Sequence, residues 1–298
     1  MNTEKKIFAL GFFDGVHLGH QALLARCVAL AAETDAVPAA ITFLRHPLAA
    51  FVENPPKLIT TDAQRDWLLY HYGIRHIEKF PVTVSFMATP WQDFLEQLVR
   101  LGAVGFVCGN DFRFGKDGQG NPERLAAFCA LHHFPCEIVP EQKLHGVRIS
   151  SSHIRQLLNN GDVAQAASFL GHPYGVTGPV VHGQGLGRTI GIPTANIDIP
   201  DHVLIPQRGV YACRAMVDGN TYMAVTNVGS RPTVGGDHVT VEPWLLDFSG
   251  DLYGKILTLQ YHAFLRPERK FDTLEELKAQ IMLDARQTRH LLSGDGAL

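Results

Sequence analysis

Residues 11–20 of the chain read GFFDGVHLGH, and this stretch decides the fold of the first half. The apolar run at 6–10 before it predicts a buried strand, and helical spacing of apolar residues over 22–32 predicts a helix after it. Such a helix points its free N–H groups and the positive end of its dipole at the loop. Three glycines let the backbone approach a ligand closely: Gly11, Gly15 and Gly19. The stretch therefore predicts a phosphate-binding loop between a strand and a helix.

Two histidines in this stretch, His17 and His20, are three positions apart and can face the same phosphate groups. Imidazole groups there can bind the charge that develops on a phosphorus atom during in-line attack. Phe12 and Asp14 complete the set of loop residues expected at a bound ATP. Two histidines at an ordinary helix start are the alternative, which the complete strand-loop-helix pattern disfavours.

Strands and helices alternate through the rest of the first half. Apolar runs at 39–43, 104–108 and 136–139 predict further strands, with helix signals between them. This alternation predicts an α/β domain with a doubly wound parallel sheet, in which ligands bind beyond the carboxyl ends of the strands. Asn110 and Asp111 directly follow one of these strands, so we expect them at that edge.

A serine-rich segment with two arginines, RISSSHIR at 148–155, stands near the end of this domain. Hydroxyl groups at a helix start and guanidinium groups are good phosphate donors. The candidate phosphate-binding residues of the segment are Arg148, Ser151, Ser152 and Arg155. A plain helix cap is the alternative, and it is the stronger interpretation of this segment taken by itself.

The second half is rich in short strands. Runs with strand character lie at 176–181, 210–217, 221–227, 239–248 and 255–264. Asp218 and Gly219 predict a hairpin between two of them, because Asp-Gly suits a type I′ turn. An amphipathic pattern over 274–292 predicts a C-terminal helix. We therefore expect one domain over residues 1–171 and a compact barrel or sandwich domain over residues 172–298.

The second half carries its own phosphate-binding signal, the glycine-rich run HGQGLGRTIGIPTAN at 182–196, which lacks the ending of a Walker A loop. Thr194 and Asn196 are two positions apart, so on an extended segment their hard oxygen atoms point to one face and can hold Mg²⁺ with a phosphate. A simple turn is the alternative on composition. The candidate ATP contacts of the run are Gly183, Gly185, Gly187, Arg188 and Thr194.

Glu242 stands between apolar neighbours in a predicted strand, where a carboxylate is costly without a partner or a role. A carboxylate in such a place can act as general base for a substrate hydroxyl. On burial statistics, an exposed strand glutamate is the alternative.

The composition of the 298-residue chain narrows the classes of protein it can belong to. A formal net charge of −3 lacks the excess of Lys and Arg that a nucleic-acid binder needs. No apolar run approaches the ~18 residues that cross a bilayer, so we expect no membrane association. The five cysteines form no CxxC pair, which favours a reducing cytoplasm over a disulfide framework. Nothing in the sequence indicates an obligatory protein partner.

Motifs in both halves resemble those of known families. The stretch at 11–20 resembles the HxGH nucleotidyltransferase superfamily, and 148–155 resembles the second signature of that superfamily. GNDFRFG at 109–115 matches a segment of bacterial flavin-adenylating enzymes. Five runs in the second half resemble riboflavin kinase: 178–196, 209–212, 227–236, 241–254 and 265–271. The whole chain resembles the bacterial family that joins riboflavin kinase to FAD synthetase.

This resemblance implies two activities. The second domain would be a six-stranded antiparallel barrel that transfers the γ-phosphate of ATP to riboflavin, giving FMN. The first domain would join FMN to the AMP part of a second ATP, giving FAD and pyrophosphate. For the kinase, the implied residues are Glu242 as base, Thr194 and Asn196 for Mg²⁺ and phosphate, and Arg266 for flavin. For the adenylation, they are His17, His20 and Arg155 as catalytic residues, and Asn110 and Asp111 for flavin.

Two departures from the family pattern bear on function. Residues 44–47 read LRHP where the family has DPHP, which puts flavin affinity and the adenylation rate in doubt. Pro243 follows Glu242 where a non-proline is usual, so we expect that position at a strand edge or at the ligand. Two alternatives stay open: a chain active only as a kinase, and a flavin-binding regulatory protein with degenerate catalytic sites.

Overall fold

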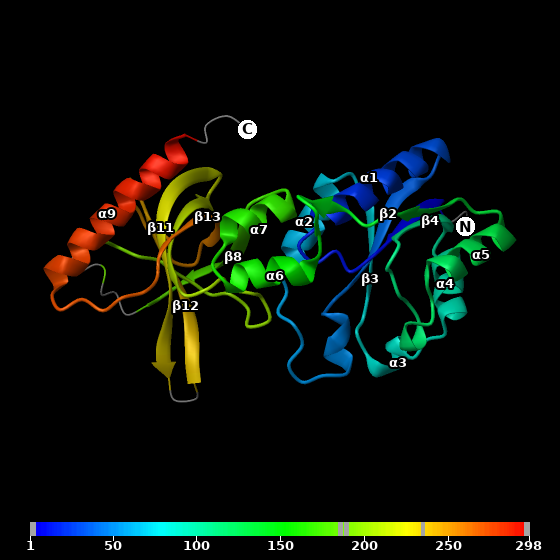
Figure 1. Ribbon diagram of the computed structural model, residues 1–298, viewed down its shortest axis with the longest axis horizontal. Coiled ribbons are helices and arrows are strands. Elements are labelled where there is room, and N and C mark those ends of the chain that lie inside the picture. The colour runs from blue at the N-terminus through cyan, green and yellow to red at the C-terminus, as the bar shows by residue number, and fades with distance from the viewer. Residues whose placement is uncertain (1–3, 184–186, 188–190, 234–235, 295–298) are drawn as a thin grey trace. The chain divides into compact units, whose positions relative to one another are not determined.

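The computed structural model describes residues 4–183, 187, 191–233 and 236–294. The chain divides into two compact units, Met1–Leu58 with Asp62–Ser151, and Ile59–Thr61 with Ser152–Leu298. Figure 1 shows the helices and strands of both units. Within the described ranges, no helix is both long enough and apolar enough to cross a membrane.

The first unit is built on a five-stranded parallel sheet with strand order β3-β2-β1-β4-β5. This order confirms the predicted doubly wound sheet. The strands are β1 (Lys6–Leu10), β2 (Val37–Phe43), β3 (His76–Phe80), β4 (Ala103–Gly109) and β5 (Cys136–Val139). The edge strand β3 escapes sequence prediction because it reads HIEKF and is only half-buried along most of its length.

Helices cover both faces of this sheet, so that side chains of β1 point into two separate cores. Ile7 and Ala9 pack with α1 (Leu18–Glu33) and α2 (Asp62–His71), whereas Phe8 and Leu10 pack with α4 (Trp91–Arg100) and α5 (Pro122–His132). A parallel strand that is buried on both faces reads as a continuous apolar run, as this one does. The shorter elements are η1 (Pro47–Ala50), α3 (Val84–Met87), η2 (Lys116–Gly118), β6 (Lys143–Leu144) and β7 (Val147–Arg148).

The second unit is a closed six-stranded antiparallel barrel with strand order β10-β11-β12-β9-β8-β13. The barrel confirms the fold that the resemblance implies and decides between barrel and sandwich. Its hairpin turn is the predicted one, because Asp218 and Gly219 both have positive φ angles, 50° and 77°. The strands are β8 (Tyr174–Val181), β9 (Asn196–Ile197), β10 (Gly209–Val217), β11 (Asn220–Thr233), β12 (Gly236–Leu245) and β13 (Ile256–Arg266).

The helices α6 (Ser151–Asn159), α7 (Val163–Leu170) and α9 (Leu274–Ser293) accompany the barrel. α7 packs against β13 and β8, and the N–H of Gln207 donates to the carbonyl oxygen of Leu158 at 3.0 Å. By its contacts, the 152–171 segment therefore belongs with the barrel, whereas the domain boundary predicted from the sequence lies between residues 171 and 172. The helix α9 begins where predicted, with Thr273 accepting a hydrogen bond from the N–H of Glu276 at 3.2 Å.

Candidate active sites

The loop after β1 is tightly coiled. Phe13, Gly15 and Val16 have φ angles of 58°, 80° and 39°, and the N–H of Val16 donates to the carbonyl oxygen of Phe13 at 3.2 Å. Positive φ is unusual for valine, and such conformations gather at functional sites. His17 caps the N-terminus of α1, where its Nδ1 accepts a hydrogen bond from the N–H of His20 at 3.2 Å. The structure thus places both predicted histidines at the helix start, facing the loop.

The rings of His17 and His20 are stacked, with centroids 3.6 Å apart and planes 11° from parallel. The edge of the Phe13 ring also meets His20, at 5.2 Å. Burial, and then the proximity of His17, lower the pKa of His20 well below its usual 6.5. Nδ1 of His20 is buried and has no hydrogen-bond partner among the described residues. His20 is therefore a neutral imidazole with unused hydrogen-bonding capacity beside a helix N-terminus, which fits a phosphate-binding role.

The serine-rich segment reaches the same loop. Ser151 Oγ donates to the carbonyl oxygen of Asp14 at 3.0 Å. Arg148 is ion-paired with Asp111 and, at 3.1 Å, with Glu141, so a predicted phosphate contact lies against a predicted flavin contact. Ser152 and Arg155 follow on α6 in the second unit.

A cavity of about 320 Å³ lies where β1, β2 and β4 end. Six phenylalanines line it: Phe12, Phe43, Phe86, Phe94, Phe112 and Phe114. Such a cavity suits a planar aromatic ligand. The ring of Phe12, predicted as a phosphate contact, is one of its walls. Asn110 and Asp111 lie directly before Phe112 in the chain.

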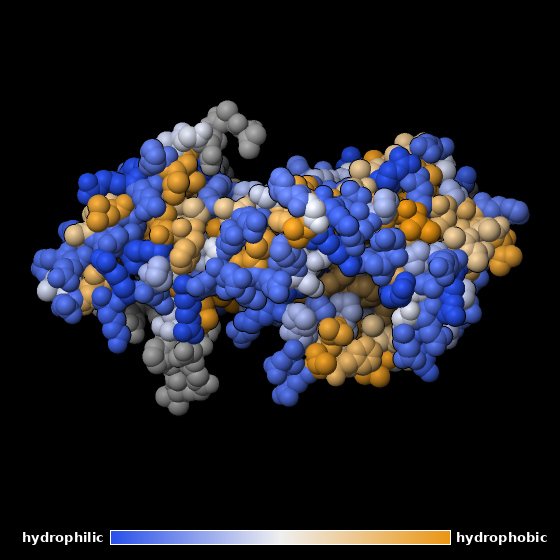
Figure 2. Space-filling view, in the orientation of Figure 1, coloured by the Kyte–Doolittle hydropathy of each residue, from blue (hydrophilic) through white to orange (hydrophobic). Residues whose placement is uncertain are grey.

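The loop that departs from the family pattern borders this cavity. Pro47 lines the cavity, and the ring of His46 meets the Phe12 ring edge-on with centroids 5.4 Å apart. Figure 2 shows apolar surface where η1 lies, and the exposed apolar side chains of this part of the chain are Leu44, Leu48, Phe51 and Val52. The two residues that match the family pattern therefore lie at the cavity, Pro47 in its wall and His46 against the Phe12 ring.

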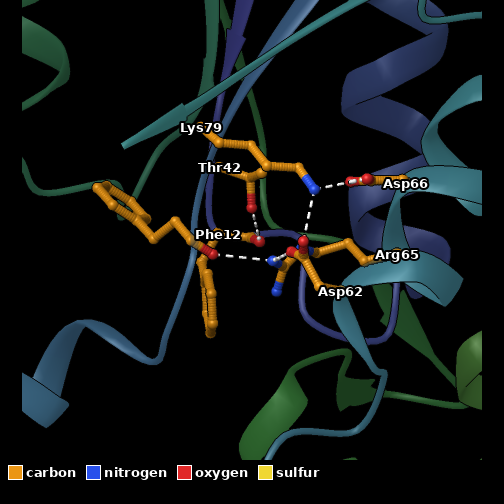
Figure 3. Close-up of polar contacts among 7 residues, drawn as sticks. Phe12, Thr42, Asp62, Arg65, Asp66 and Lys79 are labelled. Atoms are coloured by element: carbon orange, nitrogen blue, oxygen red, sulfur yellow. Dashed lines mark hydrogen bonds and ion pairs between the residues drawn. The ribbon is translucent and has the colours of Figure 1, made fainter. Parts of the chain in front are cut away.

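Figure 3 shows a polar cluster beside the Phe12 loop that the sequence did not reveal. It contains the fully buried Arg65, which hydrogen-bonds the carbonyl oxygen of Phe43. Asp62, Asp66 and Lys79 complete the cluster. The sequence around Arg65 resembles that of an ordinary polar helix, so its burial could not be predicted from the local pattern.

The barrel holds a larger cavity of about 440 Å³. Three residues predicted as kinase site residues from separate runs of the sequence line this cavity together: Thr194, Glu242 and Arg266. Glu242 is partly buried in β12, opposite Asn227 of β11, which also lines the cavity. The neighbouring Pro243 is buried, and its carbonyl oxygen accepts a hydrogen bond from the N–H of Ala195 at 2.9 Å.

Two described glycines of the glycine-rich run, Gly183 and Gly187, lie close to the two predicted Mg²⁺ and phosphate residues. A Cβ atom on Gly183 would collide with the amide of Asn196, and one on Gly187 would collide with the carbonyl oxygen of Ile192 and lie 3.3 Å from Thr194 Oγ1. Only glycine fits at these two positions. The Thr194 hydroxyl and the Asn196 amide oxygen are donors of the kind that Mg²⁺ takes, so these residues fit that ion. Gly185 and Arg188 lie outside the described residues.

Arg266 is tied to the C-terminal helix by a residue that no motif indicated. Its Nε and Nη2 donate to the carboxylate of Asp284 at 3.1 and 2.8 Å, and Gln280 Nε2 donates to the same carboxylate at 2.9 Å. Asp284 is 2% exposed and lines the cavity, as do Leu277 and Ile281 of α9. α9 therefore forms a wall of the cavity, and the Arg266–Asp284 ion pair holds it to β13.

A doubly wound α/β unit with two histidines at the start of its first helix, followed by a closed antiparallel barrel with a cavity of its own, defines a two-domain transferase. The family model described as FAD synthetase matches residues 1–153, and that described as riboflavin kinase matches residues 170–292. The chain belongs to the family of bifunctional riboflavin kinase/FMN adenylyltransferases. Relatives with that name from Listeria monocytogenes and Escherichia coli K12 are each 35% identical, covering 95% and 94% of this chain and 91% of each relative.

A solved structure shares the fold over nearly the whole chain. It comes from Streptococcus pneumoniae, and its title names a macrolide-efflux protein. The match has a TM-score of 0.90 and 30% sequence identity, and it covers 97% of this chain and 95% of the other.

Proposed function

We infer that the chain phosphorylates riboflavin with ATP to give FMN and then adenylates FMN with a second ATP to give FAD and pyrophosphate. One observation carries this conclusion: a single chain holds both the histidine loop on a parallel sheet and the barrel cavity that joins Thr194, Glu242 and Arg266. Family membership over both units supports the same pair of reactions.

In the kinase reaction, the 5′-hydroxyl oxygen of riboflavin attacks the γ-phosphorus of ATP, and ADP leaves. Glu242 takes the hydroxyl proton as the oxygen–phosphorus bond forms. Thr194 and Asn196 would hold Mg²⁺ and phosphate oxygens under the glycine-rich run, and the ion would neutralise developing charge when bound. Arg266, held by Asp284, would bind and orient the flavin.

In the adenylation, a phosphate oxygen of FMN attacks the α-phosphorus of ATP, and pyrophosphate leaves. His17, His20 and the N-terminus of α1 would stabilise the charge on the transferring group. Asn110 and Asp111 would contact the flavin. The proposed contacts to the rest of the triphosphate are Arg148, Ser151, Ser152 and Arg155.

We assign adenylation to residues 1–171 and phosphorylation to residues 172–298, and we propose a cytoplasmic location. The five cysteines support that location, because all of them are free thiols and four are buried. His46 and Pro47 at the aromatic cavity favour adenylation over the alternative of a chain active only as a kinase.

The deciding experiment incubates the purified chain with riboflavin and Mg-ATP and separates riboflavin, FMN and FAD by chromatography. We expect FMN to appear first and FAD to follow, with pyrophosphate released as FAD forms. A parallel incubation with FMN and ATP tests the second step alone. If riboflavin gives FMN but neither incubation gives FAD, the chain acts only as a kinase. If neither product forms, flavin binding without catalysis is the remaining hypothesis.

A further inference from the structure

Arg65, on α2, is completely buried although arginine rarely is. Its Nη2 donates to the carbonyl oxygen of Phe43 at 2.8 Å and to Asp62 Oδ1 at 2.5 Å. Its guanidinium carbon lies 5.1 Å from the centroid of the Phe12 ring, within the range of a cation–π contact. One side chain therefore contacts both the loop after β1 and the end of β2, as Figure 3 shows.

The two cations of the cluster, Arg65 and Lys79, balance the two carboxylates, but within the part of the chain that the structure describes only one nitrogen of the guanidinium group forms hydrogen bonds. Lys79 Nζ donates to both Asp62 and Asp66 at 2.5 Å. Burial lowers the pKa of Lys79, but the two carboxylates outweigh it and raise the pKa above its ordinary value. Nε and Nη1 of Arg65 are buried and lack a hydrogen-bond partner among the described residues. Unpaired buried donors are costly, so stability alone does not explain an arginine here.

The two groups that Arg65 holds belong to the walls of the aromatic cavity. Phe12 and Phe43 both line it, and they stand at the carboxyl ends of β1 and β2, the ligand-binding edge of a doubly wound sheet. Thr42 Oγ1 donates to the carbonyl oxygen of Phe12 at 2.8 Å, which holds the backbone but not the ring. Arg65 and His46 both contact the Phe12 ring itself.

We propose that Arg65 is a positioning residue for adenylation, which sets the Phe12 ring and the Phe43 carbonyl so that the cavity accepts the flat flavin ring of FMN. This inference rests on the proposed adenylation of FMN by the first unit. Arg65 touches no reacting atom in this role, so its loss weakens FMN binding more than it slows the transfer. Lysine keeps the charge but lacks the planar guanidinium group, which contacts the Phe12 ring while its Nη2 donates to the Phe43 carbonyl.

The test compares full-length Arg65→Met and Arg65→Lys with the matched control Lys79→Gln, in FAD formation from FMN and ATP. The control removes a charge from the same cluster, and among the described residues the Lys79 side chain forms its hydrogen bonds with Asp62 and Asp66 rather than with Phe12 or Phe43. We expect the KM for FMN to rise about 10-fold in both Arg65 variants, while kcat falls less than about 3-fold. The control should keep the parent KM. Riboflavin phosphorylation by the same preparations should be unchanged, which shows that the second unit is intact.

A double-mutant cycle with Phe12→Leu tests whether Arg65 acts through the ring. Phe12→Leu should itself raise the KM for FMN, and adding Arg65→Lys should raise it little further. Should Arg65→Met fail to fold, Arg65→Lys decides. Four results would overturn the inference: an unchanged KM in Arg65→Lys, fully multiplicative effects in the double variant, an equal rise in Lys79→Gln, or unfolding of Arg65→Lys. If the parent chain forms no FAD from FMN, the adenylation activity itself is refuted.

Discussion

His17 and His20 stack against each other at the start of α1, where the positive end of the helix dipole favours a phosphate. His17→Ala or His20→Ala should lower the rate of FAD synthesis from FMN by roughly 10²–10³-fold. FMN formation from riboflavin by the same protein, measured in a separate assay, should stay near the parent rate. A variant that loses riboflavin phosphorylation and keeps adenylation would refute the assignment of the two sites.

The buried ring of His20 also makes stability depend on pH. Its pKa in the folded chain lies well below 6.5, so below about pH 6.5 the unfolded chain binds a proton that the folded chain does not. Stability is therefore expected to fall as the pH is lowered through 6.5, by up to about 1.4 kcal/mol per pH unit for this one group. Chemical denaturation at pH 7.5 and 5.5 should show a smaller loss in His20→Asn than in the parent. An identical loss in both proteins would contradict this assignment.

Glu242 is the residue on which the kinase reaction should depend most. Glu242→Gln keeps the shape of the side chain but cannot accept the hydroxyl proton, so FMN formation should fall roughly 10²–10⁴-fold. Adenylation of supplied FMN should be largely unaffected, which makes it the internal control. Riboflavin phosphorylation near the parent rate would remove Glu242 from the mechanism.

At the scale of the element, the C-terminal helix α9 is held to the barrel by two ion pairs of very different burial. Asp284 is buried and holds Arg266 in the cavity, whereas Asp247 pairs with Arg289 of the same helix at 2.5 Å on the surface. Asp284→Asn should raise the KM for riboflavin about 10-fold and lower the thermal unfolding midpoint, because it leaves a cation without its partner in the wall. Asp247→Asn is the matched control and should change neither. Equal effects of the two substitutions would show that α9 acts only as a cover.

At the scale of the whole molecule, the boundary between the units can be tested by truncation. The fragment 172–298 retains every barrel strand and is predicted to phosphorylate riboflavin by itself. The fragment 152–298 should do so with a higher unfolding midpoint, because it keeps the buried side chains of α7 and the acceptor for the N–H of Gln207. Circular dichroism and a phosphorylation assay on both fragments provide the measurement. A folded 152–298 without kinase activity would show that the first unit completes the site.

Features that depend on neighbouring residues could be predicted from the amino-acid sequence alone. The strand, loop and helix around residues 6–33, the Asp218–Gly219 turn and the helix α9 could be predicted because backbone conformation and periodicity depend on a few neighbouring positions. Glu242, Thr194 and Arg266 were found as motif residues, but their meeting in one cavity was not derivable from local pattern. Barrel closure needs β9, a strand of two residues that shows no period of its own.

The burial of Arg65 and Asp284 became visible only in the folded chain. Each is a charged residue in a helix, a pattern that normally indicates a solvent-exposed face. Their burial points to a specific arrangement, because a charge that is removed from water needs polar or charged partners from other parts of the chain. For Arg65 these groups include the carbonyl of Phe43, 22 residues away, and for Asp284 they include Arg266, 18 residues away. These partners come together only when helices and strands pack, and a local stretch of sequence does not predict that packing.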